Sequence, residues 1–98
     1  MRRDFEACKA RLRQRHLHAG SEKFYMAALE ALQRDPELLQ GLMSNERKVV
    51  QWYLLQKKVR TLEQCAEMMG VTRDRPRVIL AIAAAKLIRR GKPPGALL

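Results

Sequence analysis

Apolar residues recur at every third or fourth position along nearly the whole chain, and this spacing limits the fold more than any other feature of the sequence. No stretch alternates polar and apolar residues for long enough to predict a strand. At 98 residues, 47% of them hydrophobic, the chain is long enough to bury a core. The sequence therefore predicts an all-α protein, a small helical bundle of about five to six helices.

Residues that favour the start or the end of a helix divide the N-terminal half of the chain into separate helices. Gly20 is expected to end the first helix, and Ser21 to cap the second. The two helices are expected to span residues 3–19 and 22–34. Asp35 before Pro36 predicts the start of a short third helix, because proline is favoured at the first helical position. Ser44 is expected to cap a fourth helix over about 45–58.

The last two helices are separated by a glycine turn. Thr61 is expected to cap the first of them, and Gly70 to end it with a positive φ. Val71 is expected to fill the core, and Thr72 or Asp74 to cap the final helix, which ends near residue 90. The residues of the final helix that are expected to face the core are Ile79, Ile82, Ala83 and Leu87. Its outward face is expected to carry Ala81, Ala84 and Ala85.

The charge of the chain is large and unevenly placed. Twenty Lys and Arg against ten Asp and Glu give a formal net charge of +10. Residues 1–43 carry a net +2, whereas residues 44–98 carry +8. A field of this sign attracts polyanions, and its concentration in one half predicts a binding surface for them there.

The sequence argues against several functional classes. Cys8 and Cys65 lie far apart on apolar stripes, which predicts buried free thiols in a reducing compartment. No apolar run approaches the roughly 18 residues of a membrane span, and no signal-peptide pattern follows the basic start. His16 and His18 do not share a helix face, and no nucleophile–base pair or glycine-rich phosphate loop is present. We expect a cytoplasmic protein that is not an enzyme and needs neither cofactor nor metal.

The C-terminal half carries the pattern of a helix-turn-helix. Ala66 is small enough for a close helix crossing, Gly70 follows four residues later, and Val71 comes next. Residues 44–90 also resemble region 4 of bacterial sigma factors. The residues that carry the resemblance are Glu46, Arg47, Val49, Val50 and Tyr53, the run 61–63, and above all the run 70–77, GVTRDRPR.

The resemblance implies a division of the chain. Residues 44–92 would form the region 4-like helix-turn-helix domain, as in small phage-type transcription regulators. Outside the resemblance, we expect residues 1–43 to be an N-terminal helical extension that serves as a partner or dimer interface. The glycines and prolines over 91–95 predict a flexible tail over 93–98. The apolar stripes over 3–34 allow a homodimer, but they could equally complete the core of a monomer.

The resemblance also implies which residues contact double-stranded DNA. Arg73 and Asp74 would reach base edges, and Arg75 and Arg77 would reach bases or phosphates. Arginine pairs with guanine through two hydrogen bonds, and a carboxylate accepts from the amino group of cytosine. The residues expected near phosphate are Lys57, Lys58, Arg60 and Thr61, and Thr72 is a further candidate for nucleic-acid binding.

Two positions depart from the family pattern. Val78 stands where the family has a polar base reader, and Pro76 where it has an aliphatic residue. A proline deep inside a helix costs about 3 kcal/mol, so the favourable arrangement starts the helix at Arg75. Asp74 would then act as the capping acceptor rather than as a base reader.

The sequence thus predicts a DNA-binding transcription regulator that contacts RNA polymerase or a sigma factor. The alternative is a protein-interaction inhibitor that binds polymerase, a sigma factor or another regulator without reading DNA. Pro76, Val78 and the alanine-rich final helix favour this alternative. RNA binding is a weaker third hypothesis, because the few aromatic residues offer little surface for base stacking.

Overall fold

The computed structural model describes residues 5–15, 19–56 and 61–91, and these form helices joined by short connections. The helices are α1 (Phe5–Arg13), α2 (Ala19–Arg34), the 3-10 helix η1 (Pro36–Gly41), α3 (Ser44–Val50) with its π-helical continuation η2 (Gln51–Leu55), α4 (Leu62–Met69) and α5 (Arg75–Arg90). The described residues contain no strand. The predicted small all-α bundle is confirmed.

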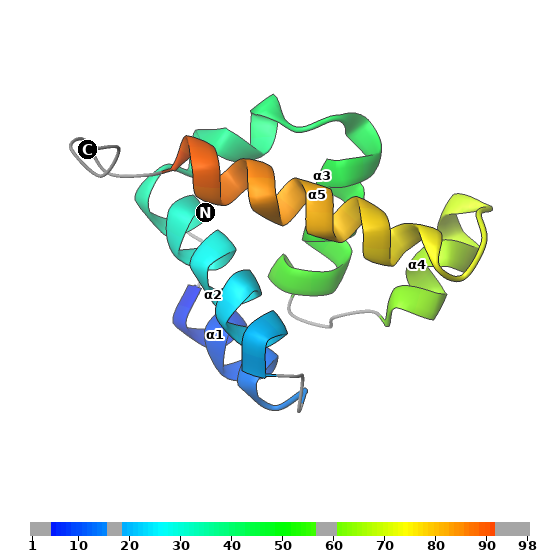
Figure 1. Ribbon diagram of the computed structural model, residues 1–98, viewed down its shortest axis with the longest axis horizontal. Helices are drawn as coiled ribbons and strands as arrows, with labels where there is room; N and C mark the ends of the chain where they lie inside the picture. The colour runs from blue at the N-terminus through cyan, green and yellow to red at the C-terminus, as the bar shows by residue number, and fades with distance from the viewer. Residues whose placement is uncertain (1–4, 16–18, 57–60, 92–98) are drawn as a thin grey trace.

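Helix α5 is the centre of the bundle. It crosses the molecule in Figure 1 and contacts α2, α3, α4 and η1, while α1 packs against α2 and η2. The largest fully buried side chains include Leu29 and Leu32 of α2, Val49 of α3, and Leu80 and Leu87 of α5. Cys8 and Leu12 of α1 belong to the same hydrophobic cluster. Most apolar side chains of α1 and α2 are therefore buried within the single chain, while Phe5, Phe24 and Met26 are partly buried.

The predicted boundary between the first two helices is wrong. α1 ends at Arg13, and α2 already begins at Ala19, so Gly20 and Ser21 lie inside its first turn rather than before it. The first N–H groups of a helix lack partners in any case, so a glycine or serine is tolerated in that turn. His16 and His18 lie outside the described residues. Cys8 and Cys65 are buried, as predicted, and neither forms a disulfide within the described residues.

Local caps define the next two elements. Asp35 caps η1 as predicted, because its carboxylate accepts a hydrogen bond from the backbone N–H of Glu37 at 3.2 Å. Ser44 is the first residue of α3 rather than its cap, which is Met43. The Glu46 carboxylate accepts from the Met43 N–H at 2.9 Å and so fixes the start of α3. The helical run ends with η2 at Leu55, three residues before the predicted end.

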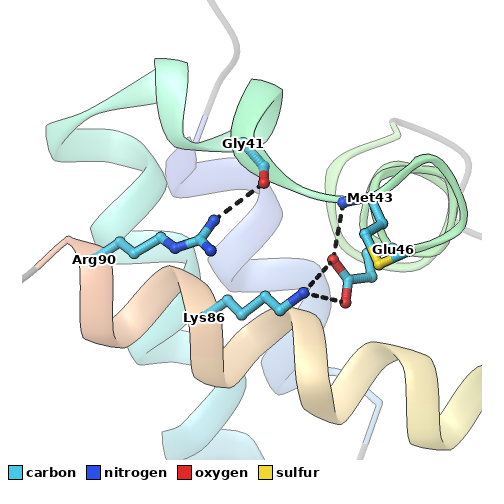
Figure 2. A network of polar contacts seen from close by, with 5 residues as sticks. All are labelled: Gly41, Met43, Glu46, Lys86 and Arg90. Atoms are coloured by element: carbon cyan, nitrogen blue, oxygen red, sulfur yellow. Dashed lines mark hydrogen bonds and ion pairs between the residues drawn. The ribbon is translucent and has the colours of Figure 1, made fainter.

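The C-terminal end of α5 is fastened to the rest of the bundle by polar contacts (Figure 2). Lys86 Nζ lies 2.8 Å from a carboxylate oxygen of the buried Glu46, and Arg90 donates to the Gly41 carbonyl at 3.0 Å. Gly91 ends the helix and accepts a hydrogen bond from Arg34 at 2.8 Å. No helix in the described part of the chain is both long and apolar enough to cross a bilayer.

Candidate nucleic-acid interface

The start and end of α4 are set by local chemistry that the sequence predicted. The Thr61 hydroxyl accepts from the Gln64 N–H at 3.0 Å, and the Gln64 side chain accepts from the Thr61 N–H at 2.9 Å. This reciprocal capping box fixes the first turn. Gly70 ends α4 with φ of 69°, a left-handed conformation that favours glycine. α4 therefore leads into the turn 71–74 in a fixed direction.

The turn that follows Gly70 leads into α5 and leaves the N-terminal end of this helix exposed to solvent. The Arg75 N–H donates to the Thr72 carbonyl at 3.1 Å, and α5 begins at Arg75, as the proline argument predicted. Pro76 lies in the first turn, where its missing N–H is no loss, and its ring is fully buried. The Asp74 side chain makes no capping hydrogen bond. The prediction that capping would occupy this carboxylate is wrong, since the turn closes through the backbone of Thr72 instead.

All predicted contact residues that the structure describes are exposed: Thr61, Thr72, Arg73, Asp74, Arg75 and Arg77. Lys57, Lys58 and Arg60 lie outside the described residues. Among the six, the three arginines and Asp74 gather around the start of α5. The Thr61 hydroxyl is already engaged in the capping box, although it keeps a second lone pair.

The three arginines point in different directions from this end of α5. Arg73 forms an ion pair with Glu63 of α4 at 2.7 Å. Arg75 lies beside the start of α3, where it lines a groove with Met43. Positions two apart on a helix lie on roughly opposite sides, and Arg77 accordingly faces the α2 side. Its positive charge acts on Tyr25, whose pKa is raised mainly by burial and by the neighbouring Tyr53, and lowered in part by Arg77.

Three of the predicted orientations on this half of the chain are wrong. Val71 does not fill the core but is 38% exposed, because the backbone turns at Gly70 toward solvent. Ile82, predicted to face the core, is 47% exposed, whereas Ala84, predicted to face outward, is buried together with Leu80. The reason is that α5 is covered by both α2 and α3, so its buried face is wide and centred differently from the predicted stripe.

Sequence reasoning missed an apolar surface next to the arginines. Val78 and Ile82 are exposed one turn apart on α5, and Met43, at the start of α3, is 67% exposed. The signal was present in the spacing of positions 75, 78, 82, 85 and 89, which places these residues on one helix face. Among the described residues, no group of three or more His, Cys, Asp or Glu side chains could hold a metal ion.

Comparison of the chain with protein-family models, with curated proteins and with solved structures found no match. The resemblance to sigma region 4 therefore remains a prediction that depends on residues 44–90 alone.

Proposed function

We propose that the chain is a DNA-binding transcription regulator that uses α4, the turn 70–74 and α5 as a helix-turn-helix. The observation that carries the proposal is the exposed cluster of Arg73, Arg75 and Arg77 around the start of α5. Basic side chains at the first turns of the second helix are the ones that reach base edges and phosphates in a major groove. The net charge of +8 over residues 44–98 supplies the long-range attraction to the duplex.

Because the three arginines point in different directions, we assign them different contacts with the duplex. Arg73 and Arg75, near the turn, would contact base edges together with Asp74, whereas Arg77 would contact a phosphate across the groove. Glu63 competes with DNA for Arg73 because it holds that guanidinium at 2.7 Å. The resemblance to sigma region 4 adds RNA polymerase or a sigma factor as the protein partner.

The test is binding of the purified chain to a randomised duplex pool, followed by fluorescence anisotropy on the selected sequence. Arg73→Ala/Arg77→Ala should weaken binding at least about tenfold, since each lost base contact is worth roughly 1–3 kcal/mol. The matched control is Arg13→Ala/Arg89→Ala, which removes the same charge from exposed positions away from the turn. Equal losses in the two variants, or selection without a motif, would show that only generic charge attraction is at work.

Glu63→Gln sharpens the same test in the opposite direction. It removes a negative charge from the face and frees Arg73, so we expect binding to tighten by about twofold to fivefold. Weaker or unchanged binding would mean that Arg73 does not contact DNA.

A second candidate function is that of a protein-interaction inhibitor that binds a transcription protein without reading DNA. The exposed Val78 and Ile82 favour it, because a duplex offers such side chains little more than thymine methyl groups. Stoichiometric capture of one acidic protein from bacterial lysate, in high salt and with nuclease present, would support it if no DNA motif is selected. Capture of none, with a clear motif, would remove it.

A further inference from the structure

A groove of about 380 Å³ lies between the start of α3 and the outward face of α5. Its lining residues are Met43, Ser44, Asn45, Glu46, Arg75, Ile79, Ile82 and Lys86. Ile79 is buried and forms the floor, whereas Met43 and Ile82 stand exposed on opposite sides. Figure 2 shows one end of this groove, where Lys86 and the Met43 backbone both reach the Glu46 carboxylate. The groove is thus apolar in its middle and polar at its ends.

The charges at the groove leave it net positive. Among the described residues that line the groove, Glu46 is the only acid, and its buried carboxylate accepts from both Lys86 and the Met43 N–H. Arg75 at the other end is exposed and forms no ion pair with any described residue. An occupant would therefore meet one unpaired guanidinium but no unpaired carboxylate.

The exposed face of α5 extends this surface lengthwise. Arg75, Val78, Ile82, Ala85 and Arg89 follow one another at spacings of three and four, and all five are exposed. At a rise of 1.5 Å per residue, the two arginines stand about 21 Å apart along the helix. Between them the face offers only apolar side chains. Its length and pattern match a helix of about four turns with apolar residues in the middle and acids near both ends.

We propose that this surface binds an acidic amphipathic helix of a partner protein. Two apolar side chains of the partner, three or four positions apart, enter between Met43 and Ile82 and cover Val78, and its carboxylates pair with Arg75 and Arg89. This is the helix-in-groove mode of recognition, for which a methionine at the mouth is well suited because its thioether adapts to different shapes. A second copy of this chain is disfavoured as occupant, because each copy carries +10.

The inference goes beyond DNA binding and does not depend on it. Arg75 belongs to both surfaces, whereas Arg73 and Arg77, the other two arginines of the proposed DNA contact, are absent from the groove lining. A failure of DNA binding would therefore leave the groove proposal standing, and a failure of the groove would leave DNA binding standing.

The experiment is selection of a displayed library of random peptides, about as long as α5, on the immobilised full chain. We expect enriched peptides to be rich in Asp and Glu and to carry two apolar residues three or four positions apart. Met43→Ser/Ile82→Ser should weaken their binding at least about tenfold, and because both side chains are exposed the fold should persist by circular dichroism. Met68→Ser, at an exposed methionine on α4, is the matched control and should leave binding unchanged.

Three results would overturn the proposal. One is the absence of any peptide enriched over beads without protein, and another is equal binding of the enriched peptides to Met43→Ser/Ile82→Ser. The third is self-association of the chain that Ile82→Ser abolishes, which would make a second copy the occupant. Arg73→Ala/Arg77→Ala should retain peptide binding even where it loses DNA, and that result separates the two proposals.

Discussion

The two ends of α5 use basic residues in opposite ways. At the C-terminal end, Lys86 pairs with the buried Glu46, and Arg90 donates to the Gly41 carbonyl (Figure 2). At the N-terminal end, Arg75 and Arg77 are exposed and form no ion pair within the described residues. The C-terminal end is therefore bound to the bundle through Lys86 and Arg90, although Arg89 there is exposed, whereas the N-terminal end presents Arg75 and Arg77 to solvent.

The difference lies in what surrounds each end rather than in the residues themselves. The C-terminal end lies against the connection between η1 and α3, where carbonyl groups and one carboxylate are available as acceptors. The N-terminal end emerges from the turn 70–74, and within the described residues the ion pair found there joins Arg73 to Glu63. A basic residue is free to bind a polyanion only where the fold supplies no acceptor for it.

Among the variants that test this difference between the two ends of α5, Lys86→Met is expected to change the stability of the fold most. It leaves the Glu46 carboxylate buried without its cation, and removing one partner of a buried ion pair typically costs 3–5 kcal/mol. Because Lys86 is only half-buried, we expect a loss of about 3 kcal/mol in the free energy of unfolding, measured by urea denaturation. Glu46→Gln/Lys86→Met is the control and should recover part of the loss. A loss as small as that of a surface pair would mean that this end of α5 is not held by the ion pair.

Gly91→Ala tests the close approach at the same end. An added Cβ would lie 2.6 Å from the Ala31 Cβ and 2.9 Å from the Leu87 carbonyl oxygen, both of which are fixed within helices. We expect a destabilisation of about 1–3 kcal/mol, which thermal unfolding would detect. Gly20→Ala is the matched control, because nothing lies within 4 Å of its added Cβ inside α2, and it should stabilise the fold by about 0.5–1 kcal/mol. Equal effects of the two substitutions would contradict the tight packing of Gly91.

The pH dependence of stability should reveal the same ion pair with a smaller effect. Burial raises the pKa of Glu46, but hydrogen bonds from Lys86 and from the Met43 N–H, with the Lys86 and Arg90 charges, outweigh it and leave the pKa below its ordinary value of 4.5. A folded-state pKa below the unfolded one stabilises the fold above about pH 4.5, and this contribution is lost as the pH falls through the folded value. The unfolding free energy of Glu46→Gln should therefore fall less on acidification than that of the natural chain. Parallel pH profiles would exclude a depressed pKa.

The smallest effect on stability is expected at the N-terminal end of α5. Arg73→Ala removes only an ion pair between two exposed side chains, so the free energy of unfolding should change by no more than about 0.5 kcal/mol. Urea denaturation of Arg73→Ala and of Lys86→Met under the same conditions compares the two ends of α5 directly. A loss near that of Lys86→Met would show that the exposed arginines support the fold after all.

The sequence predicted the elements whose boundaries are set by short-range chemistry. Thr61, Gly70 and Pro76 each act on the backbone within a few residues, so the start of α4, its end and the start of α5 could be read directly. The helix boundary predicted at Gly20 and Ser21 is wrong. Glycine and serine are tolerated within the first turn of a helix, so their presence does not require that one helix end and another begin there.

Orientation toward the core was harder to predict than helix position. The outward turn of Ile82 depends on α5 being covered from two sides by α2 and α3, and that arrangement is a property of the whole bundle. The groove beside Met43 was missed for the same reason, since its two walls are some forty residues apart in the chain. The arginines at positions 73, 75 and 77 are exposed, as the contacts that the resemblance implies require, but the ion pair of Arg73 with Glu63 was not predicted.

The most direct test of the central claim is the salt dependence of DNA affinity for the natural chain, Arg73→Ala/Arg77→Ala and Arg13→Ala/Arg89→Ala. Each phosphate contact contributes about 0.9 to the slope of log K against log salt concentration. If the start of α5 contacts the duplex, the first variant should lower the magnitude of the slope by about one, because Arg77 is its proposed phosphate contact, and the second should leave it nearly unchanged. Equal slopes for all three proteins would contradict the assignment of this end of α5 as the polyanion-binding surface.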